Sequence, residues 1–252
     1  MAKIACAGGH SKKCPGARCY IDEYTQDRIV NTALMKELKK RGHDVYDCSN
    51  EAATQNAELA AEVRVANKSG AKLFCATHFN ACSKISGKRG VEVWYYTGDA
   101  MGKKIAEKMS KDLAKLFGLP NRGAKATRNL YVLANTSMCA ILPEVCFVDA
   151  KGDVDAYKGV TAAQIAAVMA DAMEYGVGAV KKQETAFAPY VVSITKKTLP
   201  VRKTASSTAV VVTNVKQGQA FTIVAVKTVN GVKWGQLKSG AGWINLTYTK
   251  RV

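Results

Sequence analysis

The stretch Leu73-Phe-Cys-Ala-Thr-His-Phe-Asn-Ala81 is an apolar run that ends in polar side chains. Its first part, residues 72 to 77, is short and apolar, which predicts a buried strand. His78 closes the run and Asn80 follows it, where an asparagine can hydrogen-bond nearby backbone or a substrate. Taken alone, the histidine has a simpler explanation as a buried core residue with hydrogen-bond partners.

Strands and helices alternate on both sides of this run. We expect further strands at residues 3 to 7, 43 to 48, 91 to 96, 130 to 133 and 140 to 144. Helices are expected at about 22 to 41, 50 to 69 with Asn50 as the cap, 99 to 117 and 161 to 182. This alternation predicts an α/β domain, with a largely parallel or mixed sheet flanked by helices, over residues 1 to 182.

The last part of the chain has a different pattern. Residues 183 to 190 break the helical periodicity and form the expected linker. Residues 191 to 252 are rich in Val and Thr, and strands are expected at 210 to 213, 220 to 226, 233 to 237 and 242 to 245. Turns such as Asn230-Gly231 and Ser239-Gly240 separate these strands, so we expect a small all-β barrel.

Composition limits the function classes. The chain has 252 residues, of which 48% are hydrophobic, and no apolar run is long enough to predict a membrane span or a conventional signal peptide. With 37 basic and 20 acidic residues, its net charge of +17 favours polyanionic partners, including nucleic acid, acidic lipid and anionic envelope polymers. No long Arg/Lys block or nucleic-acid motif is present, so specific nucleic-acid binding is not expected.

The eight cysteines are expected to be mostly reduced thiols that pack as small hydrophobic groups. Cys14 and Cys19 differ because they lie in a loop that contains Pro and Gly. Their spacing is not that of a common zinc pair, so two free loop thiols are favoured over a disulfide or an accessory metal site.

Four residues at the ends or flanks of separate hydrophobic segments form a candidate zinc site: His10, Glu23, His78 and Glu144. Catalytic zinc is commonly held by two histidines and one carboxylate, with a fourth position open for water or substrate. A second, free carboxylate is then needed to move the proton of the water. The set therefore points to hydrolysis by metal-activated water.

Each member of this set has a simpler explanation when taken alone. A histidine after Gly8-Gly9 is a common turn residue, and Glu23 suits the positive end of a helix dipole. Asp22, beside Glu23, is an equal candidate for ligand or helix cap, whereas His43 is interpreted as structural. Glu144 is the most conspicuous acid, because a carboxylate inside an apolar run is costly to bury without a partner or a function.

The joint pattern resembles a known family. Gly-Gly-His10, Asp-Glu23-Tyr, Thr-His78-Phe-Asn-Ala and Leu-Pro-Glu144-Val-Cys-Phe are similar, in order and spacing, to the zinc-dependent N-acetylmuramoyl-L-alanine amidases of autolysins and phage endolysins. The resemblance covers about residues 1 to 180. It implies one zinc ion on His10, Glu23 and His78, with Glu144 as the general acid and base.

The same resemblance suggests binding residues. Asn80 is a candidate substrate contact, and Arg122 lies in a stretch that borders the substrate groove in such enzymes, although a solvated loop arginine is an equal explanation. In the tail, Leu199-Pro-Val-Arg202, Gly218, Trp234 and Gly242-Trp-Ile244 resemble bacterial SH3-like domains, which accompany cell-wall hydrolases and are held to bind peptidoglycan. Trp234, Trp243 and Tyr190 are its candidate contacts, and core packing is favoured for at least one tryptophan.

The resemblance implies a peptidoglycan amidase that cleaves between N-acetylmuramic acid and L-alanine. The net charge of +17 also suits adsorption to anionic wall polymers, an attraction that should weaken with salt. Without an export signal, such an enzyme is expected to be made in the cytoplasm and to reach the wall through a separate membrane lesion, as an endolysin does. Two alternatives stay open at this point. One is a zinc peptidase that cuts within the stem peptide, and the other is a non-catalytic wall-binding module.

Overall fold

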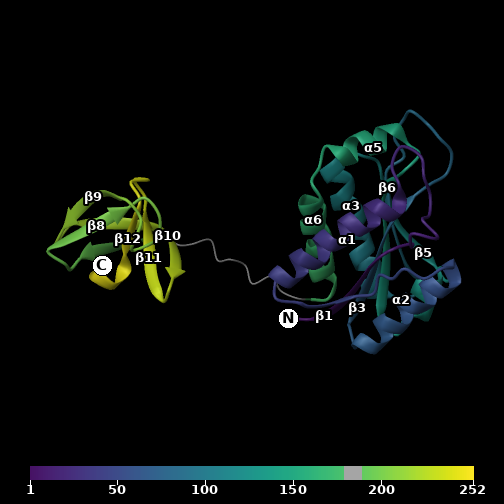
Figure 1. The fold of residues 1–252 in the computed structure, drawn as a ribbon, viewed down its shortest axis with the longest axis horizontal. Coiled ribbons are helices and arrows are strands. Elements are labelled where there is room, and N and C mark those ends of the chain that lie inside the picture. Colours follow the sequence, from purple (N-terminus) through teal and green to yellow (C-terminus); the bar gives the residue numbers. More distant parts are fainter. Residues whose placement is uncertain (179–188) are drawn as a thin grey trace. The chain divides into compact units, whose positions relative to one another are not determined.

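The computed structural model describes residues 1–178 and 189–252. The chain divides into two compact units, Met1–Val180 and Lys181–Val252 (Figure 1). Most of the expected linker, and the expected domain boundary at residue 182, lie outside the described residues. Those boundaries therefore stay predictions, and each unit is described by itself.

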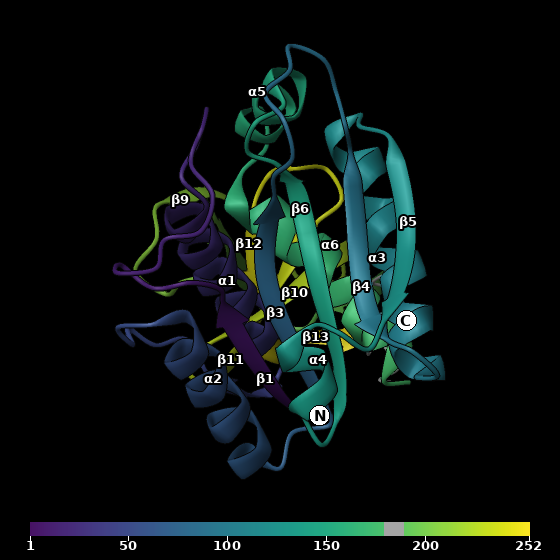
Figure 2. The ribbon, with the colours of Figure 1, turned by 90° about the vertical axis from the view of Figure 1, so that its right-hand side faces the viewer.

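The first unit is built on a six-stranded mixed sheet (Figure 2). Its strands are β1 (Lys3–Gly8), β2 (Asp44–Asp47), β3 (Leu73–Asn80), β4 (Val91–Tyr96), β5 (Asn121–Thr127) and β6 (Cys139–Phe147), in the order β2-β1-β3-β6-β4-β5. All neighbouring strands are parallel except β4 and β6, which are antiparallel. The expected mixed α/β sheet is thus confirmed.

Apolar side chains cover both faces of this sheet. The helices are α1 (Glu23–Lys40), α2 (Gln55–Ser69), α3 (Ala100–Phe117), α4 (Tyr131–Asn135), α5 (Lys151–Lys158) and α6 (Ala162–Gly176). One core contains Leu73 and Cys75 with residues of α1, α3 and α6, and the other contains Phe74 with residues of α2 and α4. Because successive strand residues point to opposite faces, β3 is apolar at every position over residues 73–76, where it lies between the two cores, and its polar side chains begin at Thr77.

Several local expectations are wrong. Residues 130 to 133, expected as a strand, belong to the loop and helix α4, where Val132 and Leu133 pack into the second core. Strand β5 was not predicted, because it lies at the edge of the sheet and an edge strand needs no apolar pattern. Thr54, rather than Asn50, caps α2, and its side chain accepts a hydrogen bond from the backbone N–H of Ala57. Helix α5 was not expected, and α6 ends at Gly176.

The second unit is a seven-stranded antiparallel sheet. Its strands are β7 (Tyr190–Ile194), β8 (Thr198–Arg202), β9 (Val211–Lys216), β10 (Ala220–Val229), β11 (Val232–Leu237), β12 (Trp243–Asn245) and β13 (Thr249–Arg251), with a short 3-10 helix, η1 (Leu246–Tyr248), before β13. The order is β13-β7-β10-β11-β12-β8-β9. Its core includes Ile194, Val201, Ile223 and Ile244. The all-β expectation is confirmed, and the SH3-like barrel stays a prediction.

Candidate metal centre

Helix α1 brings two carboxylates to the site from its first turns. Asp22 is the N-cap, since its side chain accepts a hydrogen bond from the backbone N–H of Thr25 at 2.9 Å. Glu23 and Asp27 follow on the buried face that continues as Val30 and Leu34. Between the two acids that the sequence left open, Asp22 is therefore the cap, and Glu23 faces inward.

His10 lies two residues beyond the end of β1 and adopts a left-handed backbone conformation with φ of 66°. Such a conformation is uncommon for a residue other than glycine. Arg28 of α1 supports it, because the guanidinium donates hydrogen bonds to the carbonyl oxygens of Gly8 and His10, the latter at 2.6 Å. The same guanidinium also donates to the carbonyl of Asn50 at 2.8 Å. Arg28 thus ties the end of β1 to α1.

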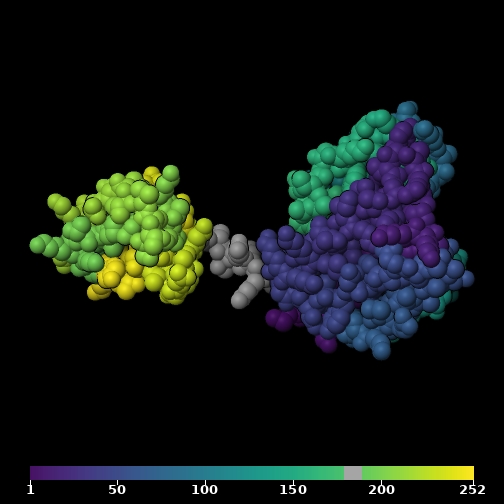
Figure 3. Space-filling view, viewed as in Figure 1, coloured from purple at the N-terminus to yellow at the C-terminus, as the bar shows by residue number. Residues whose placement is uncertain are grey.

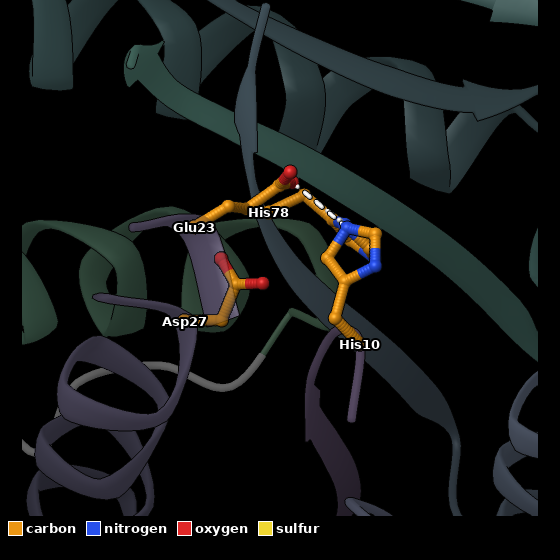
Figure 4. A group of neighbouring side chains, drawn as sticks. All are labelled: His10, Glu23, Asp27 and His78. Atoms are coloured by element: carbon orange, nitrogen blue, oxygen red, sulfur yellow. Dashed lines mark hydrogen bonds and ion pairs between the residues drawn. The ribbon is translucent and has the colours of Figure 1, made fainter. Parts of the chain in front are cut away.

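His10, Glu23, Asp27 and His78 come together in the folded chain (Figure 4). One ligand atom from each lies within 4.8 Å of the others. Glu23 is central, because its Oε1 is 3.1 Å from Nε2 of His10 and 3.3 Å from Nδ1 of His78. Imidazole nitrogens and carboxylate oxygens are the donors that zinc accepts, so this group fits a zinc ion chemically.

Asp27 is the member of this group that the sequence interpretation missed. Its side chain is fully buried, and neither carboxylate oxygen has a hydrogen-bond partner within residues 1–178 and 189–252. A signal was available, because Asp27 follows Glu23 by four residues and so shares its helix face. The two Asp27 oxygens lie beside three potential metal ligands and have no partner among the described residues, which suits a site that binds a cation.

The charges of the group are strongly coupled. Burial opposes ionisation of Glu23, but its hydrogen bonds to His10 and His78 prevail and lower the pKa of this carboxyl. Burial also opposes protonation of His10, and the hydrogen bond to Glu23 outweighs it, so the pKa of His10 is raised. The pKa of Asp27 is raised well above its usual value by burial, then by the charges of Glu23 and Glu144. The site favours positive charge beside Glu23.

Two glycines let backbone approach the rings closely. A Cβ atom on Gly9 would lie 2.1 Å from the ring of His78, and one on Gly16 would lie 2.5 Å from Nε2 of His10 and from a carboxylate oxygen of Glu23. Gly16 belongs to the loop between β1 and α1. In Figure 3, the purple N-terminal part of the chain reaches the surface of the first unit. The backbone N–H of Ala17 donates to Glu23 at 2.8 Å. This loop therefore lies directly against the side chains of His10 and Glu23.

Glu144 lies within β6, not at its end, and is paired in register with His78 on β3 and with Glu92 on β4. Its Oε2 atom has no hydrogen-bond partner among the described residues. Burial, followed by the charges of Glu23 and Glu92, raises the pKa of Glu144 well above its usual value. A half-buried carboxyl with a raised pKa beside possible metal ligands is suited to proton transfer.

Two of the expected substrate-binding side chains contact a buried glutamate that the sequence interpretation missed. Glu92 is 4% exposed, and its Oε1 accepts a hydrogen bond from Asn80 at 2.8 Å. Its Oε2 accepts one from Nε of Arg122 at 2.6 Å. In the second unit, Trp234 is buried and Trp243 is partly exposed. Direct contact with substrate stays a prediction for all four expected binding residues, Asn80, Arg122, Trp234 and Trp243.

The comparisons with known proteins agree with this arrangement. The family model described as N-acetylmuramoyl-L-alanine amidase matches residues 4–175, which cover the first unit's sheet and helices. In residues 1–178 and 189–252, no helix has the length and apolar character needed to cross a membrane.

Individual relatives and a solved structure are also similar to this chain. An endolysin of Bacillus phage SPP1 is 31% identical over 203 residues, with 73% of each chain covered. An uncharacterized protein of Clostridium perfringens is 38% identical over 157 residues, but the alignment spans only 47% of that protein and 62% of this chain. A catalytic domain of the CD27L endolysin targeting Clostridia difficile has a TM-score of 0.63 and 29% identity, with 69% of this chain and 97% of that chain covered.

Proposed function

Because the chain belongs to the N-acetylmuramoyl-L-alanine amidase family, we propose that it hydrolyses the amide that joins N-acetylmuramic acid to L-alanine in peptidoglycan. One observation carries the proposal. Glu23 lies between His10 and His78, and Glu144 is paired in register with His78 on the neighbouring strand. Two histidines, one carboxylate and a further free carboxylate make up the minimal set for hydrolysis by metal-activated water.

We further propose that His10, Glu23 and His78 hold one zinc ion. Bound there, zinc would supply Lewis-acid chemistry, polarising the scissile carbonyl and lowering the pKa of the attacking water towards about 7. Asp27 lies close enough to be a fourth candidate donor. Because a catalytic site keeps one position open, we assign Asp27 to the surroundings of the zinc ion and not to a permanent fourth ligand.

Glu144 would act as the general base and acid of the reaction. Its free Oε2 is available to accept a proton from the attacking water, and the protonated carboxyl then returns that proton to the nitrogen of the leaving alanine. The raised pKa supports this role, since a carboxyl whose pKa lies closer to the working pH both accepts and donates readily.

The site of action follows from the same proposal. Relatives named endolysin support action at the bacterial cell wall. We propose that the protein reaches the wall through a separate membrane lesion. The second unit, as an SH3-like module, would hold the enzyme on that wall. The chain spans about half the length of the Clostridium perfringens relatives it matches. Catalysis by the first unit and wall binding by the second are therefore proposed for these two units alone.

Digestion of purified peptidoglycan by the zinc-loaded protein tests the proposal, with mass spectrometry of the products. The expected result is a new amino group on L-alanine together with intact muramic acid. New termini inside the stem peptide would instead identify the peptidase alternative. Wall binding without any new terminus would identify a non-catalytic binding module.

A further inference from the structure

The second unit has an unusual charge composition. Residues 189–252 contain ten Lys or Arg and no Asp or Glu, whereas residues 1–178 contain 25 basic and 19 acidic residues. Ordinary protein surfaces intersperse both signs. The cations of residues 189–252 therefore have no acidic side chain as a partner within the same residues. The positive charges of these residues are therefore not neutralised by ion pairs with acidic side chains of the same residues.

These cations lie at the surface. Nine of the ten are exposed, and Arg202, which is half-buried, donates a hydrogen bond to the carbonyl of Ala209 at 2.6 Å. The exposed cations come from several strands and turns and do not form one continuous run of sequence. Folding therefore brings these cations together on the surface of the unit from separate parts of the sequence.

Three of the cations are held against aromatic rings. The ammonium of Lys196 lies 4.5 Å from the ring centre of Tyr248, the guanidinium of Arg251 lies 4.4 Å from that of Tyr190, and Lys227 lies 5.2 Å from that of Trp243. A ring beneath a long side chain restricts its rotamers before any ligand arrives. Less conformational entropy is then lost when the cation binds an anion.

Two of these pairs gather at one edge of the sheet. Strand β13 is the outermost strand and pairs with β7, with Lys250 opposite Ser193 and Arg251 opposite Val192. Lys196 follows β7, and the backbone of Thr195 donates a hydrogen bond to the carbonyl of Tyr248. Lys196, Lys250 and Arg251 therefore form a cationic edge, which is the name used below for these three residues.

We propose that the cationic edge binds an anionic, phosphodiester-linked polymer of the cell wall, and thereby holds the enzyme on walls that carry it. The proposal deepens the proposed function, on which it rests for the presence of the protein at the wall. Repeated phosphates spaced along a flexible chain match separate cations distributed over a surface. Peptidoglycan strands alone offer carboxylates but no such repeating phosphate.

The chemistry favours a wall polymer over a nucleic acid. Proteins that bind single strands leave aromatic faces open so that bases can stack on them. Here the rings of Tyr190 and Tyr248 each have a cation over one face. The second unit also lacks the helix that most double-strand readers insert into a groove, since η1 is the only helix within residues 189–252 and spans three residues.

Co-sedimentation with Gram-positive cell walls tests the proposal. The full chain is used with Glu144→Gln, so that the walls are not digested. Walls with their phosphodiester polymers are compared with the same walls after extraction by hydrofluoric acid, which removes these polymers and leaves peptidoglycan. The test variant carries Lys196→Gln, Lys250→Gln and Arg251→Gln. The matched control carries Lys36→Gln, Lys72→Gln and Lys158→Gln, which remove the same charge from exposed positions of the first unit.

We expect the protein with an unchanged cationic edge to bind intact walls about 10-fold more tightly than extracted walls at low salt. This difference in affinity should disappear at high salt. The test variant should lose this advantage, and the control should keep most of it. Free polymer, released from untreated walls by mild extraction with trichloroacetic acid so that its phosphodiester links stay intact, should displace the unmodified protein, a readout that does not depend on whether the test variant folds. Equal binding to both wall preparations would overturn the proposal, as would equal losses in both variants.

Two further outcomes separate possible failures. If duplex DNA at equal phosphate concentration displaces the protein as completely as the wall polymer does, the assigned class of partner is wrong. Cleavage of small soluble muropeptides by the zinc-loaded chain without Glu144→Gln reports on the catalytic proposal alone. Failure of that cleavage would refute the amidase function, whereas a wall-binding failure with normal cleavage would refute only the cationic edge.

Discussion

Glu92 and Glu144 are paired in register on the antiparallel strands β4 and β6, but they differ in their hydrogen-bond partners. Glu92 accepts hydrogen bonds from Asn80 and Arg122, whereas Oε2 of Glu144 has no partner among the described residues. Two neighbouring carboxylates thus lie in different environments: one accepts hydrogen bonds from a cation and an amide, and the other keeps an oxygen without a partner among the described residues. Such a division is a common way to assign one carboxyl to proton transfer.

Replacing Glu92 with Gln should lower the pKa of Glu144, because one of the negative charges that raises this pKa is removed. Under the proposed mechanism, Glu144 must be ionised to accept a proton. The acidic limb of the pH profile of kcat/KM should therefore move to lower pH. The comparison is made between variants loaded with the same metal.

Glu107→Gln is the matched control for this change. The Glu107 side chain is 59% exposed on α3, so its removal should leave the acidic limb in place. An acidic limb that moves by the same amount in both variants would show that Glu92 has no specific effect on Glu144.

His78→Ala and Glu144→Ala should separate metal binding from turnover. Loss of His78 removes one of the ligands around Glu23, so zinc content should fall together with activity. Loss of Glu144 should leave zinc content near that of the unchanged protein and lower kcat by about 10²-fold or more. Metal analysis and muropeptide cleavage are measured on the same samples. Full activity in Glu144→Ala would contradict the proposed proton transfer.

Gly9→Ala should disrupt the metal centre through steric contact alone. The added Cβ would lie 2.1 Å from the ring of His78, which would have to move away from Glu23. We expect weaker zinc binding, measured by competition with a chelator. Gly87→Ala is the control, because its Cβ would meet no atom closer than Ile85 Cδ1 at 3.9 Å. Equal zinc affinity in both variants would show that the close approach at Gly9 is unimportant.

Glu62→Gln should raise the free energy of unfolding at alkaline pH. Glu62 is fully buried on α2, and burial together with the nearby charge of Glu58 raises its pKa well above the usual value. A carboxyl whose folded pKa is raised binds its proton more tightly in the folded state, so stability is lost as pH rises above its unfolded pKa of about 4.3.

Urea denaturation at pH 5 and pH 8 measures this effect. The advantage of Glu62→Gln over the unchanged protein should reach about 1 kcal/mol or more at pH 8 and should shrink towards pH 5. Glu107→Gln, at an exposed position, should show no comparable dependence on pH. A pH-independent difference for Glu62→Gln would mean that packing, not ionisation, controls stability at this position.

The sequence by itself determined the features that arise from local patterns. Uninterrupted apolar runs such as the one before His78 predicted buried strands, and the 3.6-residue periodicity predicted α1 and α3. His10, Glu23, His78 and Glu144 were recognisable because polar side chains at the ends of apolar segments, or within them, are costly without a partner. Their residue types alone suggested metal chemistry, and the structure brings the first three within ligand distance of one another.

Only the tertiary structure decided which side chains surround that set. Asp27 and Glu92 became visible as parts of the site through helix packing and strand register, and register also placed Glu144 beside His78. Helix α4 and edge strand β5 escaped prediction because packing and edge position, not local propensity, select their conformations. The physical reason is the same throughout. Local preferences amount to fractions of a kcal/mol per residue, and contacts between distant segments outweigh them.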